Sequence, residues 1–159
     1  GMTAAYEAAA RGHAVTLFER NEKTGKKLFI TGKGRCNFTN AAAIEDFFQN
    51  IPRNPRFLFS ALYGYTNADT VAFLENAGVA TKVERGGRVF PASDKSSDVL
   101  RAFSQNLARA GVELALNARV EGVRREEGGF FLSINKRETR FDKIILATGA
   151  RAVTPPMSG

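Results

Sequence analysis

Apolar residues recur at helical spacing in some segments of the chain and alternate or run together in others. The clearest helical spacing joins Val99, Phe103 and Leu107, and Gly111 follows as a helix stop. Shorter helices are predicted over residues 2–11, 44–49, 57–63 and 68–76. Strands are predicted over residues 13–18, 79–84, 88–90, 112–116, 120–125, 130–135 and 140–147. This alternation of helices and strands indicates an α/β fold with a parallel sheet.

Small polar residues and glycines mark where the helices begin and end. Gly12 stops the first helix. Asn67 is the predicted N-cap of the helix over 68–76. Either Ser96 or Ser97 is predicted to cap the long helix that follows.

The last third of the chain predicts a β-meander followed by a buried strand. A Glu-Glu-Gly-Gly turn at residues 126–129 makes a hairpin of the two strands beside it, and a second turn follows at 136–138. The continuous apolar run at 144–147 is typical of a strand buried on both faces. The pair Thr148–Gly149 then indicates a sharp turn beside a ligand or, as the alternative, a turn with no ligand.

The beginning of the chain has the spacing of a dinucleotide-binding unit. An alanine-rich helix leads into the strand at 13–18, and Glu19 follows that strand. In such units the last glycine of the fingerprint begins the helix, and an acid that binds the ribose follows about 20 residues later. Gly1 and Glu19 fit that interval, so we expect the first strand and two more glycines to precede Gly1. The alternative is an ordinary alanine-rich helix before an ordinary strand.

A basic segment with several glycines follows at residues 26–40. Its glycines allow the backbone to approach a ligand closely. Lys27, Lys33 and Arg35 offer cationic partners for phosphate. The segment is therefore predicted to contact a nucleotide cofactor.

Composition limits the classes of function. The chain has 159 residues, of which 43% are hydrophobic and 25% charged, enough for one domain with a real core. No apolar run approaches the roughly 20 residues that span a bilayer. The chain has a single cysteine, which excludes an internal disulfide. It also has a single histidine, so it holds too few residues of these two types to build a zinc site from them. We therefore expect a cytoplasmic protein that binds no metal and no membrane.

The formal net charge of +7 has two interpretations. A basic chain can bind the phosphates of nucleic acid. Alternatively, the charges are solvated, and a few of them face one bound pyrophosphate. The basic residues are dispersed over unrelated elements, and neither a helix-turn-helix nor an RNA-binding aromatic signature accompanies them. We therefore expect no nucleic-acid partner, with a non-catalytic basic nucleotide- or RNA-binding module as the alternative.

Three blocks of residues carry a family resemblance: 13–27 running on to 31–40, 87–99, and 144–149. They resemble the BaiN/YhiN-like NAD(P)/FAD-dependent oxidoreductases, a bacterial flavoprotein family in the glutathione-reductase-like group. The resemblance reaches to about Gly149. It implies a Rossmann-like FAD-binding domain with a parallel sheet and an inserted β-meander. It also implies NAD(P)H as electron donor and a small organic molecule as substrate.

The resemblance further implies that the domain is truncated at both ends. The family's fingerprint glycines would precede Gly1, and its loop with Tyr-Pro and Thr-Gly-Ser after Gly149 is replaced here by another sequence. We expect residues 1–159 to form a single incomplete FAD-binding domain that binds FAD poorly alone. Its parts would be a βαβ remnant with the cofactor loop (1–40), a helical segment with short strands (41–95), and a helix, strand, meander and Ala-Thr-Gly strand (96–159).

Cofactor contacts implied by the resemblance are spread along the chain. Gly1 would face the pyrophosphate at a helix N-terminus, Glu19 would accept hydrogen bonds from the adenosine ribose, and Arg20 would flank the adenine. The other implied contacts come from the cofactor loop, the start of the meander and the last turn: Lys27, Gly34, Arg35, Cys36, Asn37, Val120, Thr148 and Gly149. The sequence offers no convincing catalytic acid or base.

Several of these residues have structural alternatives. Glu19 could be a solvated strand end. Arg35 could cap a neighbouring helix or pair with Asp94. Cys36 is more often a packed small residue than a redox thiol, and Arg88 could also pair with Asp94.

Overall fold

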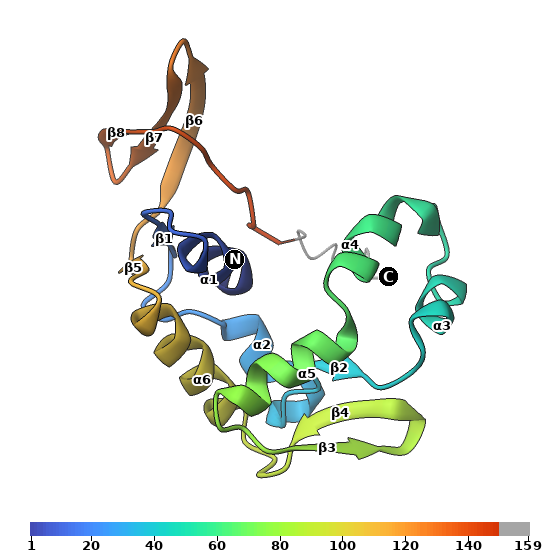
Figure 1. Ribbon diagram of the computed structural model, residues 1–159. Helices are drawn as coiled ribbons and strands as arrows, with labels where there is room; N and C mark the ends of the chain where they lie inside the picture. The colour runs from blue at the N-terminus through green and yellow to red at the C-terminus, as the bar shows by residue number, and fades with distance from the viewer. Residues whose placement is uncertain (150–159) are drawn as a thin grey trace, which may run out of the picture. The chain divides into compact units, whose positions relative to one another are not determined.

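A computed structural model describes residues 1–149, which form two compact units (Figure 1). The first unit contains Gly1–Asn21 and the chain from Val112 onward. The second unit contains Glu22–Gly111. No helix within residues 1–149 is both long and apolar enough to cross a membrane. The assignment of the whole chain to one domain stays a prediction.

The first unit begins with a helix that leads into a parallel pair of strands. Helix α1 (Met2–Ala10) buries Ala5. It is followed by Gly12, whose φ of +84° lies in the left-handed region that glycine adopts without a steric penalty. Strand β1 (Thr16–Phe18) then pairs in parallel with β5 (Glu113–Ala115). The predicted α/β order with parallel strands is confirmed in this unit.

A three-stranded antiparallel meander follows β5. It consists of β6 (Val120–Glu126), β7 (Gly129–Ile134) and β8 (Arg137–Phe141), with β7 in the centre (Figure 1). The ring of Phe141 meets the ring of Phe18 edge-on, with centroids 5.7 Å apart, and so ties the meander to β1. The predicted hairpin is confirmed. The predicted second turn at 136–138 is wrong, because Asn135 and Lys136, both with a positive φ, form the turn and Arg137 already begins β8.

The predicted strand over residues 140–147 is wrong beyond Phe141. Residues 143–149 have no regular secondary structure, and Ile145 and Leu146 are 65% and 74% exposed. The apolar run of a parallel strand is buried when neighbouring strands pair with its edges and helices cover both faces of the sheet. Within residues 1–149 no strand pairs with this segment, so its apolar side chains stay exposed.

A small antiparallel sheet organises the second unit. Its order is β2 (Thr39–Asn40), β4 (Arg88–Pro91), β3 (Thr81–Glu84). A short 3-10 turn, η3 (Arg85–Gly87), joins β3 to β4. Val89 and Phe90 of the central strand are each 1% exposed, so β4 supplies the middle of this unit's core.

The helices of the second unit lie above and beside this sheet in Figure 1. They are α2 (Lys26–Ile30), η1 (Thr31–Gly34), α3 (Ile44–Gln49), η2 (Pro55–Leu58), α4 (Phe59–Gly64), α5 (Asn67–Asn76) and α6 (Ser96–Arg109). The predicted apolar face of α6 is confirmed, because Val99, Phe103 and Leu107 are buried. The rings of Phe73 and Phe103 lie 5.1 Å apart and join α5 to α6.

Two predicted helix caps are wrong, because better partners compete for the side chains. Thr66 caps α5, since its hydroxyl accepts from the Asp69 N–H and the Asp69 carboxylate accepts from the Thr66 N–H. Asn67 instead donates to backbone carbonyls of Asn40 and Ala42. Lys95 is the N-cap residue of α6, and no side chain caps it.

Candidate functional site

The predicted cofactor residues fall in both units. In the first unit, Gly1 precedes α1 and lies beside the segment that leads to Thr148 and Gly149. A Cβ placed on Gly1 would lie 3.7 Å from Leu17 Cδ1 and 3.8 Å from Ala147 Cβ. The structure therefore brings the start of α1 together with the Ala-Thr-Gly segment, as a dinucleotide site would require.

Glu19 lies at the carboxyl end of β1, where ligands bind in parallel α/β sheets. Its backbone is held on both sides, because its N–H donates to the Ala115 carbonyl and its carbonyl accepts from the Ala118 N–H, both at 2.9 Å. Its Oε1 accepts from the backbone N–H of Asn21 at 2.9 Å and from the Asn21 amide at 2.6 Å. Within the described residues Oε2 has no hydrogen bond, so one carboxylate oxygen is available to a ligand.

Two further predicted cofactor residues, Arg20 and Val120, lie in the first unit. Arg20 follows Glu19 and is exposed. Val120 begins β6 opposite Ile134, and a register shift follows it. Their predicted contacts with adenine stay predictions.

In the second unit, the predicted loop at 26–40 contains helical turns that the sequence pattern did not reveal. Lys27 lies in α2 and Gly34 ends η1. Gly32 has a φ of +58°, and a Cβ there would lie only 2.9 Å from both the Asn37 nitrogen and Phe90 Cε1. Glycine is therefore required at this position to let the loop pack on β4.

Ser96 fastens this loop to α6. Its side chain is buried, with 2% of the residue exposed. The hydroxyl lies 2.8 Å from the carbonyl oxygen of Phe29 and also within hydrogen-bonding reach of the Gly34 carbonyl. The sequence predicted Ser96 as a possible helix cap. It did not predict these hydrogen bonds, because the partners of Ser96 lie more than 60 residues away in the chain.

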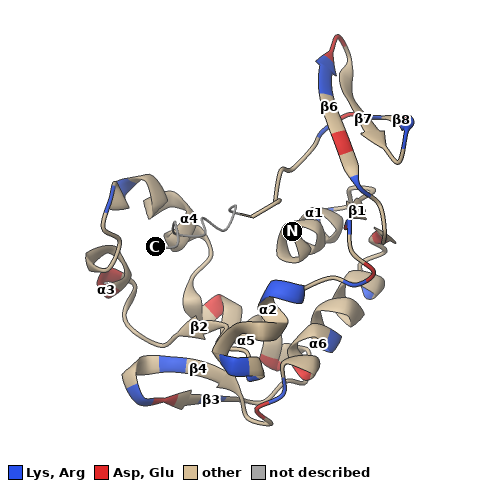
Figure 2. Cartoon of the chain, turned by 180° about the vertical axis from the view of Figure 1, so that it is seen from behind, with Lys and Arg blue, Asp and Glu red and all other residues tan. Residues whose placement is uncertain are grey.

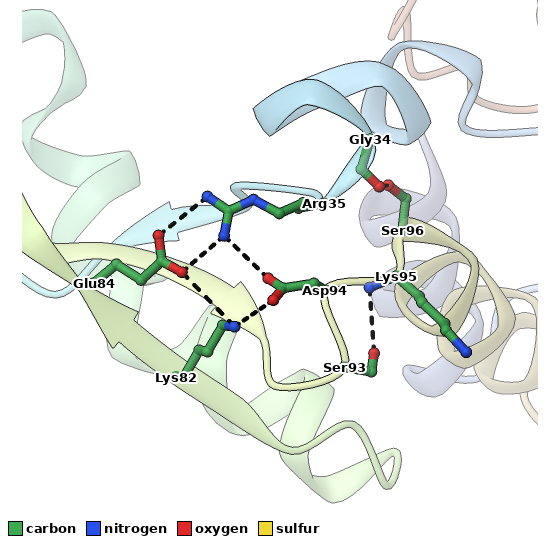
Figure 3. A network of polar contacts seen from close by, with 8 residues as sticks. All are labelled: Gly34, Arg35, Lys82, Glu84, Ser93, Asp94, Lys95 and Ser96. Carbon is green, nitrogen blue, oxygen red and sulfur yellow. Dashed lines mark hydrogen bonds and ion pairs between the residues drawn. The ribbon is translucent and has the colours of Figure 1, made fainter.

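Arg35 is the centre of a network of four charges (Figure 3). Its guanidinium donates to both oxygens of Glu84, at 2.8 and 3.1 Å, and to Asp94 at 3.2 Å. Lys82 donates to Asp94 at 2.5 Å and lies 3.7 Å from Glu84. The guanidinium carbon also lies 4.2 Å from the centroid of the Phe90 ring. The predicted alternative of an Arg35–Asp94 pair is confirmed.

Arg88 does not pair with Asp94, although the sequence allowed that pairing. Its Nε donates to the Arg85 carbonyl at 3.1 Å. Sequence reading missed Glu84 and Lys82 as partners of this network, because a β-hairpin rather than a local motif brings them to Arg35. The cofactor contact predicted for Arg35 stays a prediction.

Ion pairing shifts the titration of both acids in this network. The hydrogen bond from Arg35 lowers the pKa of Glu84, and the hydrogen bond from Lys82 lowers the pKa of Asp94. A carboxyl group whose folded-state pKa is lowered stabilises the fold at pH values above its unfolded pKa. That stabilisation is lost as the pH falls through the folded-state pKa.

Glu84→Gln is therefore expected to make the melting temperature depend less on pH under acidic conditions. Wild-type Tm should fall as the pH decreases from about 5 to about 2, and the fall should be shallower in the variant. Thermal unfolding monitored by circular dichroism at each pH measures this. Asp46→Asn, which removes an acid from α3 outside the network, is the control. If Tm falls with decreasing pH as steeply in Glu84→Gln as in wild type, the ion pairs of Glu84 do not stabilise the fold.

Cys36 and Asn37 help to hold the loop in place, and their predicted contacts with the cofactor stay predictions. Cys36 is completely buried with a φ of +63°, and burial raises the pKa of its thiol. Thiolates are the reactive form of cysteine, so the raised pKa disfavours redox reactivity. In the amide orientation that satisfies its neighbours, Asn37 donates to the Thr39 and Val89 carbonyls and so joins the loop to β4.

A comparison with protein families decides the ancestry of this arrangement. The description "HI0933-like protein Rossmann domain" matches residues 1–158. The chain belongs to this family. The predicted resemblance to BaiN/YhiN-like flavoproteins is thereby confirmed, and so is the Rossmann-type α/β fold.

Two curated relatives of this HI0933-like chain are named for different activities. A 3-dehydro-bile acid delta(4,6)-reductase of Clostridium scindens is 34% identical over 154 residues, which are 96% of this chain and 37% of the relative. A ribosomal RNA dihydrouridine synthase of Escherichia coli is 29% identical over 149 residues, which are 94% of this chain and 36% of the relative. The chain thus spans little more than a third of these relatives.

A solved structure shares the fold of this HI0933-like chain. The crystal structure of Thermovibrio ammonificans THI4 matches with a TM-score of 0.50 and 15% identity, over 84% of this chain and 43% of that chain. At this identity the likeness shows the fold alone.

Proposed function

We propose that this chain is the FAD-binding part of a flavin-dependent oxidoreductase. The observation that carries the proposal is Glu19 at the carboxyl end of a parallel strand that follows α1, in a chain of the HI0933-like Rossmann family. In this position an acid binds a ribose diol. The reductase and synthase activities in the names of the two relatives support a redox reaction.

The residues of the first unit fit a dinucleotide. Helix α1 begins without a side-chain cap and without an acid in its first turn, so its first N–H groups suit an anion such as a pyrophosphate. Gly1 has no side chain to occupy that space. Glu19 Oε2 is left for a hydroxyl donor, while Asn21 fixes the other oxygen.

Bound FAD would supply hydride transfer from NAD(P)H to an organic substrate. The role of this chain's own residues is to bind and orient. Glu19 would hold the ribose, and α1 would hold the phosphates. Ser96 and the Arg35 network would keep the cofactor loop at 26–40 in one conformation.

We favour a small-molecule substrate over nucleic acid. Many cations of the described residues are already balanced: Arg124 pairs with Glu126 and Glu138, and Arg140 pairs with Asp142. Figure 2 shows basic and acidic positions interleaved along the meander. A nucleic-acid surface instead concentrates unpaired cations on one face.

The buried, unpaired Cys36 suits a reducing, cytoplasmic location.

Replacing Glu19 by alanine tests this function. In the full-length protein that contains this chain, FAD affinity, followed by quenching of flavin fluorescence, should fall by roughly 1–3 kcal/mol because ribose hydroxyls would lose a charged acceptor. Glu127→Ala is the matched control, since it removes an exposed acid at the hairpin tip of the same unit. Flavin absorbance of the purified protein separates the proposal from the alternative of a non-catalytic RNA-binding module. Equal FAD affinity in Glu19→Ala and wild type would refute the ribose role.

A further inference from the structure

The Glu19 side chain is held in one orientation by hydrogen bonds within the first unit. Its Oε1 accepts from both the backbone N–H and the side-chain amide of Asn21, at 2.9 and 2.6 Å. A free glutamate side chain loses rotamer freedom when a ligand immobilises it, and this loss weakens binding. The two hydrogen bonds from Asn21 impose that order in advance. Glu19 therefore offers Oε2 to a ligand from a side chain that is already oriented.

The backbone that carries Glu19 and Asn21 is itself fixed by the segment after β5. The Ala118 N–H donates to the Glu19 carbonyl at 2.9 Å, and the Asn117 N–H donates to the Asn21 carbonyl at 3.0 Å. Ala118 is buried, so this segment packs closely at the end of β1. The position of the Glu19–Asn21 pair thus depends on residues 117 and 118.

Asn135 fastens the same segment from the meander. It lies in the turn between β7 and β8 with a φ of +48°, a left-handed conformation that asparagine adopts more readily than most residues. Its side-chain amide donates to the Asn117 carbonyl at 3.1 Å, and its Oδ1 accepts from the Arg119 N–H at 3.3 Å. Its backbone N–H also donates to the Arg119 carbonyl at 3.3 Å. One side chain therefore bridges the residues on both sides of Ala118.

We propose that Asn21 and Asn135 are positioning residues for Glu19, and that they link its carboxylate to the second turn of the meander. Asn21 acts directly, because it holds Oε1. Asn135 acts through the backbone of residues 117–119, which holds Glu19 and Asn21. This inference rests on the proposed function, since it takes the FAD ribose as the ligand of Glu19 Oε2.

A double-mutant cycle with Glu19→Ala tests the positioning roles in the full-length protein that contains this chain. Asn21→Ala should raise the dissociation constant of FAD about fivefold and Asn135→Gly about threefold, as followed by quenching of flavin fluorescence. In the Glu19→Ala background each change should alter that constant by less than about 1.5-fold, because no carboxylate remains to be oriented. Residues that only stabilise the fold would instead weaken FAD binding equally in both backgrounds.

Two further variants complete the experiment. Lys136→Gly is the matched control for Asn135→Gly, because Lys136 is its neighbour in the same turn, has a φ of +66° and lends no side-chain atom to these hydrogen bonds. It should bind FAD like wild type. Asn21→Asp keeps the shape of the side chain but places an oxygen against Glu19 Oε1. It should weaken FAD binding at least as much as Asn21→Ala, and it replaces Asn21→Ala in the cycle if that variant does not fold.

The outcomes separate this inference from the proposed function. Equal losses of FAD affinity in both backgrounds, or no loss in the Asn21 and Asn135 variants, would overturn the positioning roles and leave Glu19 as the ribose ligand. Unchanged FAD affinity in Glu19→Ala alone would refute the ribose role, and the positioning roles with it.

Discussion

Replacing Phe90 by alanine is expected to lower the free energy of unfolding by about 3–5 kcal/mol. The residue is 1% exposed, and its ring lies under the Arg35 guanidinium and against Gly32. Alanine would remove most of this buried side chain and leave a cavity where the loop meets β4. Urea unfolding followed by circular dichroism measures the change.

Phe57→Ala is the matched control for Phe90. Phe57 is 79% exposed, so its truncation should change the free energy of unfolding by less than about 0.5 kcal/mol. Phe90→Leu, which keeps much of the buried volume, should cost roughly 1–1.5 kcal/mol. A loss below about 1 kcal/mol in Phe90→Ala would show that β4 is not the centre of this core.

The second large effect is expected for Ser96→Val, at about 2–4 kcal/mol of the free energy of unfolding. Valine would leave the carbonyls of Phe29 and Gly34 without their buried donor and would add a methyl group in a packed site. The same urea titration measures the loss. Ser97→Val is an adjacent control, because Ser97 is exposed, and it should stay within about 0.5 kcal/mol of wild type. Similar losses in both variants would mean that β-branching in α6, rather than the buried hydroxyl, is responsible.

Elements set by local pattern were predictable from the sequence. The apolar face of α6, the helix at 44–49 and the meander depend on spacing and turn residues that lie close together in the chain. Family membership was predictable as well, because the blocks at 31–40 and 87–99 are distinctive.

Features that depend on distant partners were not predictable. The apolar run at 144–147 has strand character, yet a parallel strand forms only when it pairs with another strand, and within residues 1–149 no strand pairs with this run. Serine is a residue type that often caps helices, but the hydroxyl of Ser96 donates to backbone carbonyls of α2 and η1 instead. The pairing of Arg35 with Glu84 was missed, because Glu84 lies in β3, 49 residues later in the chain.

The stretch from α3 to α4 is held differently from the rest of the second unit. None of its helical residues is buried, and its main side-chain packing is a cluster of three rings, Phe48, Phe59 and Tyr63. Segments with few buried contacts open at a small fraction of the global unfolding free energy. We therefore expect amide hydrogens in this stretch to exchange with solvent through local opening, and those of α6 to exchange only when the core of the unit opens. Residues 44–64 are thus expected to unfold and refold while the cofactor loop stays folded.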